Sequence, residues 1–463
     1  MNLHLPQFSC GLQKIDQAFQ IACGDVAGNI ALFRGGLLPE AESVFIAGKS
    51  YSSPWTRDGA FNVWYSGFLA PEVSHNTLLA VLEKDGHGRL RIGGEYWDRI
   101  IWAVGAWHYR LWNDAPGFAN LALEAIENTL AEAEAREQDP ADGLFRGGAC
   151  FQDGVSAYPD SFVSLKRGSG IMDYLSSPPP GAKTAPAGTG LPMKALSTNA
   201  LYYAAYRIAD RFRGILGKRP AHQESAQTLK DAVNRRFRNP ATGTYRYLLD
   251  ADDPNPERQE GLGHAFALLS GIVPEKERSA LIKNVHTAPH GIPCVWPQME
   301  RYAGTPGVYA RHSGVIWPQV NAAWCSALTA CGERELAFHE TELLAEKAFR
   351  DKVFHEVYHP DTGLPYGGIQ EKGTEKGVVE WASCPRQTWA ATGFVHMVLR
   401  SFLGLHADED GLTLSPVFPG GCEEIRLDGL HYRNAVLNLR IRRGASEFRH
   451  IPADITGDQT IQI

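Results

Sequence analysis

The chain has 463 residues, of which 44% are hydrophobic and 21% charged, and its formal net charge is −7. This is the composition of an ordinary globular protein, which excludes disordered, collagen-like and coiled-coil chains. A mild acidic excess provides no basic surface for nucleic acid or anionic membranes, and no apolar run is long enough to span a bilayer. We therefore expect neither nucleic acid nor a membrane as a partner.

The eight cysteines show no CxxC spacing, and residues 1–19 lack the basic start and continuous apolar core of a secretory signal. These features predict mostly buried thiols in a cytoplasmic protein without a metal site. The chain also lacks a phosphate-cradling glycine motif and a Gly-x-Ser-x-Gly motif. We expect no cofactor, and homo-oligomer formation is left open.

Apolar residues recur at helical spacing along most of the chain, and the helical windows come in pairs. Long loops rich in glycine, proline and aromatic residues join alternate helices, as is typical of functional loops. This pattern predicts an all-α domain over residues 1–405. The expected helices are 58–68 with 72–83, 96–112 with 118–135, 197–216 with 223–238, 261–270 with 274–285, 314–330 with 333–354, and a last one over about 385–403.

The pattern changes after Gly404 to short β-branched or alternating runs bounded by Gly, Pro and Asp. Such runs predict a small β unit over residues 406–463. A unit of this size is small for an independent core, so we expect it to pack on the helical domain as an extension. The expected strands are 411–416, 424–427, 431–441 and 447–451.

Two aromatic and charged motifs stand at expected helix starts. Trp55 is followed by Arg57 and Asp58, and Trp97 by Asp98. An arginine and a carboxylate can hold sugar hydroxyls by hydrogen bonds while an indole covers the apolar face of the sugar. The alternative is a helix-capping aspartate with a surface arginine, and the residues alone favour neither.

The loop after residue 142 gathers glycines, aromatics and acids without periodicity, as expected of a cleft. Asp153 and Asp173 are the candidate proton donors in it. A carboxyl group packed against aromatic rings has a raised pKa and can keep its proton near neutral pH. Loop aspartates are more often turn-formers, and the sequence does not decide between the two candidates.

Two Trp-Pro-Gln runs contain Trp296 and Trp317, the second run ending at Gln319. Each places an indole and an amide at a helix start, where both could line a carbohydrate subsite. A core tryptophan followed by a helix-starting proline is an equally good interpretation of either run.

A glutamate at the expected end of the long helix 333–354 is a candidate general base. Glu356 comes just before a turn, and a carboxylate fixed there could activate a water molecule. A solvated glutamate at a frayed helix end is the alternative. Glu371 and Glu380 follow and compete for the same role, and Trp389 opens the last helix.

Taken together, these motifs resemble the six-hairpin glycoside hydrolases. The sequence is similar to the family of processing α-glucosidase I and mannosylglycerate hydrolase, to the trehalases and to the glucosidase part of glycogen debranching enzymes. Trp55-x-Arg57-Asp58 resembles an early sugar-binding motif, and Glu356-Val-Tyr358-His-Pro-Asp-Thr-Gly363 resembles the element that carries the catalytic base. The segment from Cys384 to Trp389 is similar to the last helix of debranching enzymes.

The resemblance implies an (α/α)6 toroid barrel whose active site lies among the loops at one end. It also implies an inverting exo-acting glycoside hydrolase on short α-linked glycosides, an α-glucoside or an α-mannoside. Asp153 or Asp173 would be the acid and Glu356 the base, with Glu371 as the substitute because Glu356 lies farther from the last helix than in these families. Trp55, Arg57, Asp58, Trp97, Asp98, Trp296, Trp317, Gln319, Glu371 and Trp389 would bind the sugar.

Three other functions fit parts of the pattern. A sugar epimerase or isomerase on the same barrel would transfer protons through His264, His312 or His355. A polysaccharide lyase would need a basic groove for uronic acids, which the sequence does not indicate. A carbohydrate-binding protein without enzymatic activity would bind sugars and not convert them.

Overall fold

The computed structural model describes residues 3, 5–94, 96–113, 115–163, 170–171, 174, 190–372, 377–444 and 449–462. The described residues form twelve α-helices together with short 3-10 turns and short strands. The chain is mostly helical with a small C-terminal β-sheet, as the sequence predicts. Within these ranges no helix is both long and apolar enough to cross a membrane.

Six helices contact one another in a closed ring, each touching the next and the last touching the first. Nearly all residues of these helices are buried, since each ring helix packs against its ring neighbours and against outer helices. A Cβ added to Gly105 would lie 2.9 Å from the backbone of Ala60, so only glycine permits this approach of two ring helices. In order, the ring consists of α2 (Thr56–Ser66), α4 (Trp97–Trp112), α7 (Leu196–Ile215), α9 (Gly261–Leu269), α11 (Pro318–Ala330) and α14 (Thr388–Ser401).

The other six helices lie outside the ring and are amphipathic. In α8, for example, Ala226, Leu229 and Val233 face inward at helical spacing, while most of its other side chains reach solvent. Helix α5 packs on α4 and α7, and α12 packs on α11, α14 and α1. The outer helices are α1 (Gln13–Ala27), α3 (Pro71–Leu79), α5 (Phe118–Arg136), α8 (Gln223–Arg236), α10 (Arg278–Asn284) and α12 (Arg334–Asp351).

Every helix expected from the sequence is present, with some ends displaced. Helix α11 begins at Pro318, a proline at its first position, and α14 begins at Thr388 rather than at Pro385. Helix α12 ends at Asp351, so Glu356 lies at a bend in the following loop and not at a helix end. Helix α1 is an addition to the expected set.

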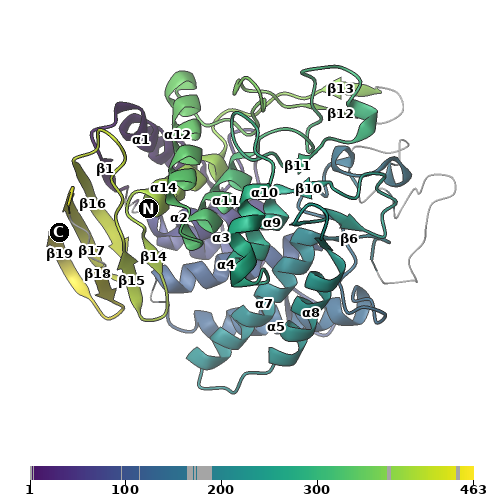
Figure 1. Cartoon of the computed structure of the whole chain (residues 1–463). Coiled ribbons are helices and arrows are strands. Elements are labelled where there is room, and N and C mark those ends of the chain that lie inside the picture. Colours follow the sequence, from purple (N-terminus) through teal and green to yellow (C-terminus); the bar gives the residue numbers. More distant parts are fainter. Residues whose placement is uncertain are drawn as a thin grey trace.

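The β unit lies on one side of the helices (Figure 1). Its larger sheet has the order β1-β16-β17-β19, with β16 and β17 forming an antiparallel hairpin and β19 running parallel to β17. The N-terminal strand β1 pairs with β16, so this sheet joins segments from both parts of the sequence. The strands are β1 (Gln7–Ser9), β14 (His406–Ala407), β15 (Gly411–Leu414), β16 (Glu424–Tyr432), β17 (Asn434–Arg442), β18 (Arg449–Pro452) and β19 (Thr456–Gln462).

Short paired strands brace the long loops between the helices. Strands β6 and β10 to β13 lie on the side of the helices away from β16 and β17 (Figure 1). The pairs are β2 (Ile30–Phe33) with β3 (Glu42–Phe45), β4 (Leu82–Lys84) with β5 (Leu90–Ile92), β6 (Lys194–Ala195) with β9 (Leu248–Leu249), β7 (Arg238–Asn239) with β8 (Thr244–Tyr245), β10 (Gln259–Glu260) with β11 (Val295–Trp296), and β12 (Ile369–Glu371) with β13 (Val378–Glu380).

Candidate functional site

The N-terminal ends of the ring helices carry most of the residues singled out in the sequence. Arg57 and Asp58 lie in the first turn of α2, Asp98 in the first turn of α4, Gln319 in that of α11 and Trp389 in that of α14. Each pair of successive ring helices is separated by an outer helix or a long connection, which lets their starts meet at one end. Motifs far apart in the sequence therefore gather there.

The first ion pair of the site joins Asp153 to Arg57. Nη1 of Arg57 lies 3.0 Å from Oδ1 of Asp153 and also donates to the carbonyl of Cys150 at 2.5 Å. The guanidinium lies over the ring of Trp389, 5.8 Å from its centroid. The Asp153 side chain is 53% exposed, so it is open to a ligand.

The charge of Asp153 is strongly favoured in the free protein. The surrounding protein atoms disfavour a charge here, yet the guanidinium of Arg57, followed by His312 and Arg311, holds the pKa of Asp153 well below its usual range. Asp153 is thus a carboxylate at neutral pH in the free protein, and the raised pKa expected from the sequence is wrong for this residue because Arg57 lies beside it.

The second ion pair joins Glu356 to Arg311. Nη2 of Arg311 lies 3.0 Å from Oε2 of Glu356, and Glu356 is only 2% exposed. The Arg311 guanidinium lies 5.3 Å from the ring centroids of both Trp317 and Trp381. The backbone N–H of Glu356 donates to the carbonyl of Cys384 at 2.9 Å. The base candidate is therefore fixed by a buried counter-charge and by its backbone.

Asp58 connects the two ion pairs electrostatically. Burial raises its pKa to about 7, Arg57 opposes the increase, and the charges of Asp98, Asp153 and Glu356 add to it. The two ion pairs are also neighbours in space, because Arg57 and Arg311 lie over Trp389 and Trp317, whose ring centroids are 5.5 Å apart. The structure thus brings these four carboxyl groups into one site.

Glu371 lies in a different environment. Its carboxylate pairs with Nε of Arg301 at 3.2 Å and accepts a hydrogen bond from the hydroxyl of Tyr302. The same arginine donates to the carbonyl of Val155 at 2.6 Å and pairs with Asp160 at 2.9 Å. Glu371 therefore anchors, through Arg301, the loop that follows Asp153.

Gln370 and His312 support the same loop. Oε1 of Gln370 accepts from the Ser156 hydroxyl at 2.8 Å and lies 3.2 Å from Nδ1 of His312. A Cβ added to Gly154 would lie 2.0 Å from that ring nitrogen, so the position after Asp153 requires glycine. The loop is held on both sides of the acid candidate.

The tryptophans of the predicted site divide into two groups. Trp97, Trp317 and Trp389 are at most 3% exposed and belong to the packed floor of the site or to the core. Trp55 is 55% exposed at the start of α2, and Trp296 is half-buried and stacks on His286 with ring centroids 4.2 Å apart. Gln319 is buried, with an amide oxygen that has no hydrogen-bond partner among the described residues. Asp173 lies outside the described residues.

Arg311 is a residue of the candidate site that the sequence motifs missed. Its neighbour His312 begins the second Trp-Pro-Gln run and is a sequence candidate only for proton transfer. His264, the other buried candidate, uses both ring nitrogens on the backbone of Glu260 and Tyr245. An arginine directly before an aromatic-rich loop was the available signal, but arginines are too common on surfaces for that signal to be specific.

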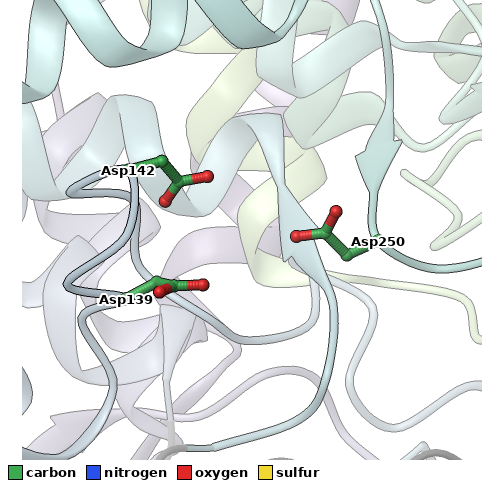
Figure 2. Close-up of side chains that lie close together, drawn as sticks. All are labelled: Asp139, Asp142 and Asp250. Carbon is green, nitrogen blue, oxygen red and sulfur yellow. The ribbon is translucent and has the colours of Figure 1, made fainter.

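One group of carboxylates has the spacing of a cation site. The carboxylates of Asp139, Asp142 and Asp250 point toward a shared space (Figure 2), with oxygens within 4.8 Å of one another. Nζ of Lys194 lies among them, at 2.8 to 2.9 Å from each, and Arg236 pairs with Asp142 at 2.7 Å. The lysine ammonium thus already provides the cation that these three carboxylates require.

Comparison with known proteins agrees with the fold. The chain is similar to a protein named sialidase, with 14% identity, a TM-score of 0.66, and coverage of 93% of this chain and 37% of that one. It is similar to the GH78 family rhamnosidase of Bacillus sp. GL1, with 12% identity, a TM-score of 0.63, and coverage of 100% and 44%. The chain thus spans less than half the length of these two proteins.

A third structure is of comparable length. The GH63 mannosylglycerate hydrolase from Thermus thermophilus in complex with glucose has 16% identity and a TM-score of 0.57, with coverage of 82% of this chain and 99% of that one. At these identities the likeness establishes the six-hairpin glycosidase fold alone. No curated protein sequence matches the chain.

A family model adds the assignment that the folds alone do not give. It matches residues 62–375, a segment that includes Asp153, Arg311 and Glu356. Arg57, Asp58 and Trp389 lie outside the matched segment and join the same site in space. With two arginine-paired carboxyl groups at one end of a six-hairpin fold and a match over more than half of its length, the chain belongs to the mannosylglycerate hydrolase MGH1-like glycoside hydrolase domain family.

Proposed function

We propose that this protein is an inverting, exo-acting glycoside hydrolase on short α-linked glycosides, with an α-glucoside or an α-mannoside as substrate. The observation that carries the proposal is the pair of carboxyl groups, Asp153 and Glu356, each held by its own arginine in one site. An acid and a base on separate supports are the two groups that glycoside hydrolysis requires.

Asp153 donates a proton to the leaving oxygen, and Glu356 removes a proton from the water that attacks the anomeric carbon from the opposite face. The glycosidic bond breaks as the new C–O bond forms, and the product has the inverted configuration. This arrangement needs the carboxyl groups roughly 6.5–9.5 Å apart, to leave room for the water. Asp173 is the alternative acid.

The strong pairing of Asp153 with Arg57 has a consequence for the acid. A carboxylate cannot donate a proton, so the substrate must weaken this pairing before reaction. Sugar hydroxyls that accept hydrogen bonds from Arg57 compete with Asp153 for the same donors, which makes protonation of Asp153 easier. Sugar binding and protonation of Asp153 are then coupled.

We propose Glu356 rather than Glu371 as the base. Glu356 makes one side-chain ion pair in the described part of the chain, whereas both oxygens of Glu371 are engaged by Arg301 and Tyr302. A base needs a free lone pair to accept the proton of water. The environment of Glu356 supports that role, and that of Glu371 supports an anchoring role.

We further propose that the ring and its outer helices form the (α/α)6 toroid barrel of six-hairpin glycosidases over residues 1–405, with residues 406–463 as the packed β extension. The closed contact order of the six ring helices supports this architecture. The similar length of the mannosylglycerate hydrolase supports a small glycoside as substrate.

Two experiments test the proposal. Purified protein is incubated with a panel of α-linked disaccharides and glycosyl-glycerates, and the first-formed anomer is read by NMR. Inverted product is expected, and a retained configuration would exclude the mechanism. In the second, Glu356→Gln should abolish turnover in a folded protein, whereas Glu371→Gln should keep part of it; the reverse order would assign the base to Glu371.

A further inference from the structure

A cavity lies at the opposite end of the helical ring from the carboxyl groups. Its volume is about 280 Å³, and residues from all six ring helices line it, mostly in their C-terminal halves. Strand β14 covers part of it with His406 and Ala407. This volume is close to the lower end of the range for ligand pockets, roughly 300–1,000 Å³, and leaves room for a small ring and not for an oligosaccharide.

The polar groups that line this cavity are basic or neutral. Three arginines and three histidines contribute, and no aspartate or glutamate is among the described lining residues: Arg207, Arg211, Arg400, His108, His396 and His406. Glu409 pairs with Arg211 at 2.8 Å and is the nearby acid of the mouth. The wall between these groups is apolar and aromatic, with Trp64, Trp107 and Phe266 as its largest members.

Part of the positive charge stabilises helix ends. Nη1 of Arg207 donates to the carbonyl of Ser270, which follows α9, and Nη1 of Arg400 donates to that of Leu405, beyond α14. Basic groups offset the partial negative charge at helix C-termini in this way. Arg400 also donates from Nε to the hydroxyl of Thr329 at 3.3 Å, and its Nη1 lies 3.0 Å from Nδ1 of His406. These contacts leave Nη2 of Arg400 for a ligand.

Glu409 is the counter-ion of Arg211, whereas Arg400 and His108 make no ion pair with a described residue. Burial, followed by the charges of His396, His406, Arg400 and Arg211, lowers the pKa of His108 well below its usual value. Burial also lowers the pKa of Arg400 to about 10, with Arg334 adding to the decrease. Burial is the main cause of both shifts. A buried arginine without an ion pair is the setting that an anion would relieve.

We propose that this cavity binds a small anion with an apolar body, an aromatic carboxylate or phosphate monoester. The oxyanion lies against Arg400 and His108, and the ring packs between Trp64, Trp107 and Phe266. This site is separate from the carboxyl groups of the catalytic end and is independent of the function proposed for them. Carboxylate and phosphate share the chemistry that the arginine recognises.

Isothermal titration calorimetry tests the site with three probes: benzoate, phenyl phosphate and uncharged benzyl alcohol. One molecule of at least one anion per chain is expected, and the tighter of the two identifies the oxyanion. Benzyl alcohol should bind at least about tenfold more weakly, because it lacks the charge-assisted hydrogen bonds. Equal binding of the alcohol, or no binding of either anion at millimolar concentration, would overturn the proposal.

Substitutions at both ends of the ring test where the anion binds. Arg400→Gln and His108→Asn should each weaken anion binding, the first by about tenfold or more. Arg136→Gln removes the same charge from the outer surface and should leave binding unchanged. Arg57→Gln removes a catalytic-end arginine and should also leave it unchanged. Binding that is lost in Arg57→Gln and kept in Arg400→Gln would place the anion at the catalytic end and refute the proposal.

Discussion

Arg57 holds Asp153 in its ionised form, with Nη1 of the arginine 3.0 Å from Oδ1 of the aspartate. In Arg57→Gln the carboxyl group loses its nearest positive charge, so its pKa should rise from its depressed value. If Asp153 is the acid, the alkaline limb of the kcat/KM profile, which reports the acid of the free enzyme, should move to higher pH. The value of kcat/KM at neutral pH should fall at least about tenfold, because a sugar-binding group is also lost.

Arg57→Lys is the matched control, since it keeps the charge and loses the second nitrogen. It should leave the alkaline limb close to that of the wild type. An unchanged limb in Arg57→Gln would show that Asp153 does not supply the proton and would favour Asp173.

Arg311 is expected to act through Glu356. Arg311→Met leaves a buried carboxylate without its partner, which costs about 3–5 kcal/mol of unfolding free energy, and turnover should fall by at least about 100-fold. Arg311→Lys keeps the charge and should restore part of both. Urea unfolding and steady-state kinetics measure the two effects. A loss of stability with full turnover would limit Arg311 to a structural role.

The burial of Glu260 predicts that the free energy of unfolding depends on pH. This glutamate is fully buried, and burial raises its pKa to about 7, while the hydrogen bonds from Ser197 oppose the shift. Between about pH 4.5 and 7 the folded chain keeps the proton that the unfolded chain releases, so stability falls as the pH rises and levels off above 7.

Glu260→Gln removes this titration and keeps an acceptor for the backbone N–H of Ser197. Relative to the wild type, its unfolding free energy should gain roughly 3 kcal/mol on going from pH 4.5 to pH 8. Glu346→Gln, at an exposed glutamate, is the control for loss of one charge. Parallel pH curves for wild type and Glu260→Gln would contradict the prediction.

The position of Lys194 among three carboxylates predicts that its removal creates a cation site. In Lys194→Ala the carboxylates of Asp139, Asp142 and Asp250 lose the ammonium that lies among them and repel one another, so the melting temperature should fall. Calcium accepts several carboxylate oxygens and should raise the melting temperature of the variant well above its effect on the wild type. An equal effect of calcium on both proteins would show that the three carboxylates do not form a site.

Most of the fold follows from periodic patterns, and the exceptions have physical reasons. Ile15, Phe19, Ala22 and Val26 have the spacing of a helix, so α1 was readable from the sequence. Strand β19 was not, because its side chains are largely exposed and polar, and its pairing with β17 supplies what the pattern lacks.

The site was predictable as residue types and not as geometry. Trp55, Arg57, Asp58 and Glu356 form short motifs that can be recognised in the chain. The pairing of Arg311 with Glu356 and the anchoring of Glu371 by Arg301 depend on loops whose conformation no periodicity determines. Charged partners across such loops become visible only in three dimensions.

The contact between α14 and α2 has a consequence for biosynthesis. The ring cannot close until residues 388–401 have left the ribosome, long after α2 (Thr56–Ser66) has done so. At a synthesis rate of about 5–20 residues per second, roughly tens of seconds pass between the synthesis of α2 and that of α14. During most of synthesis the ring is therefore open, and the apolar surface of α2 that α14 will cover stays exposed. Binding of a chaperone to this surface would protect the nascent chain from aggregation.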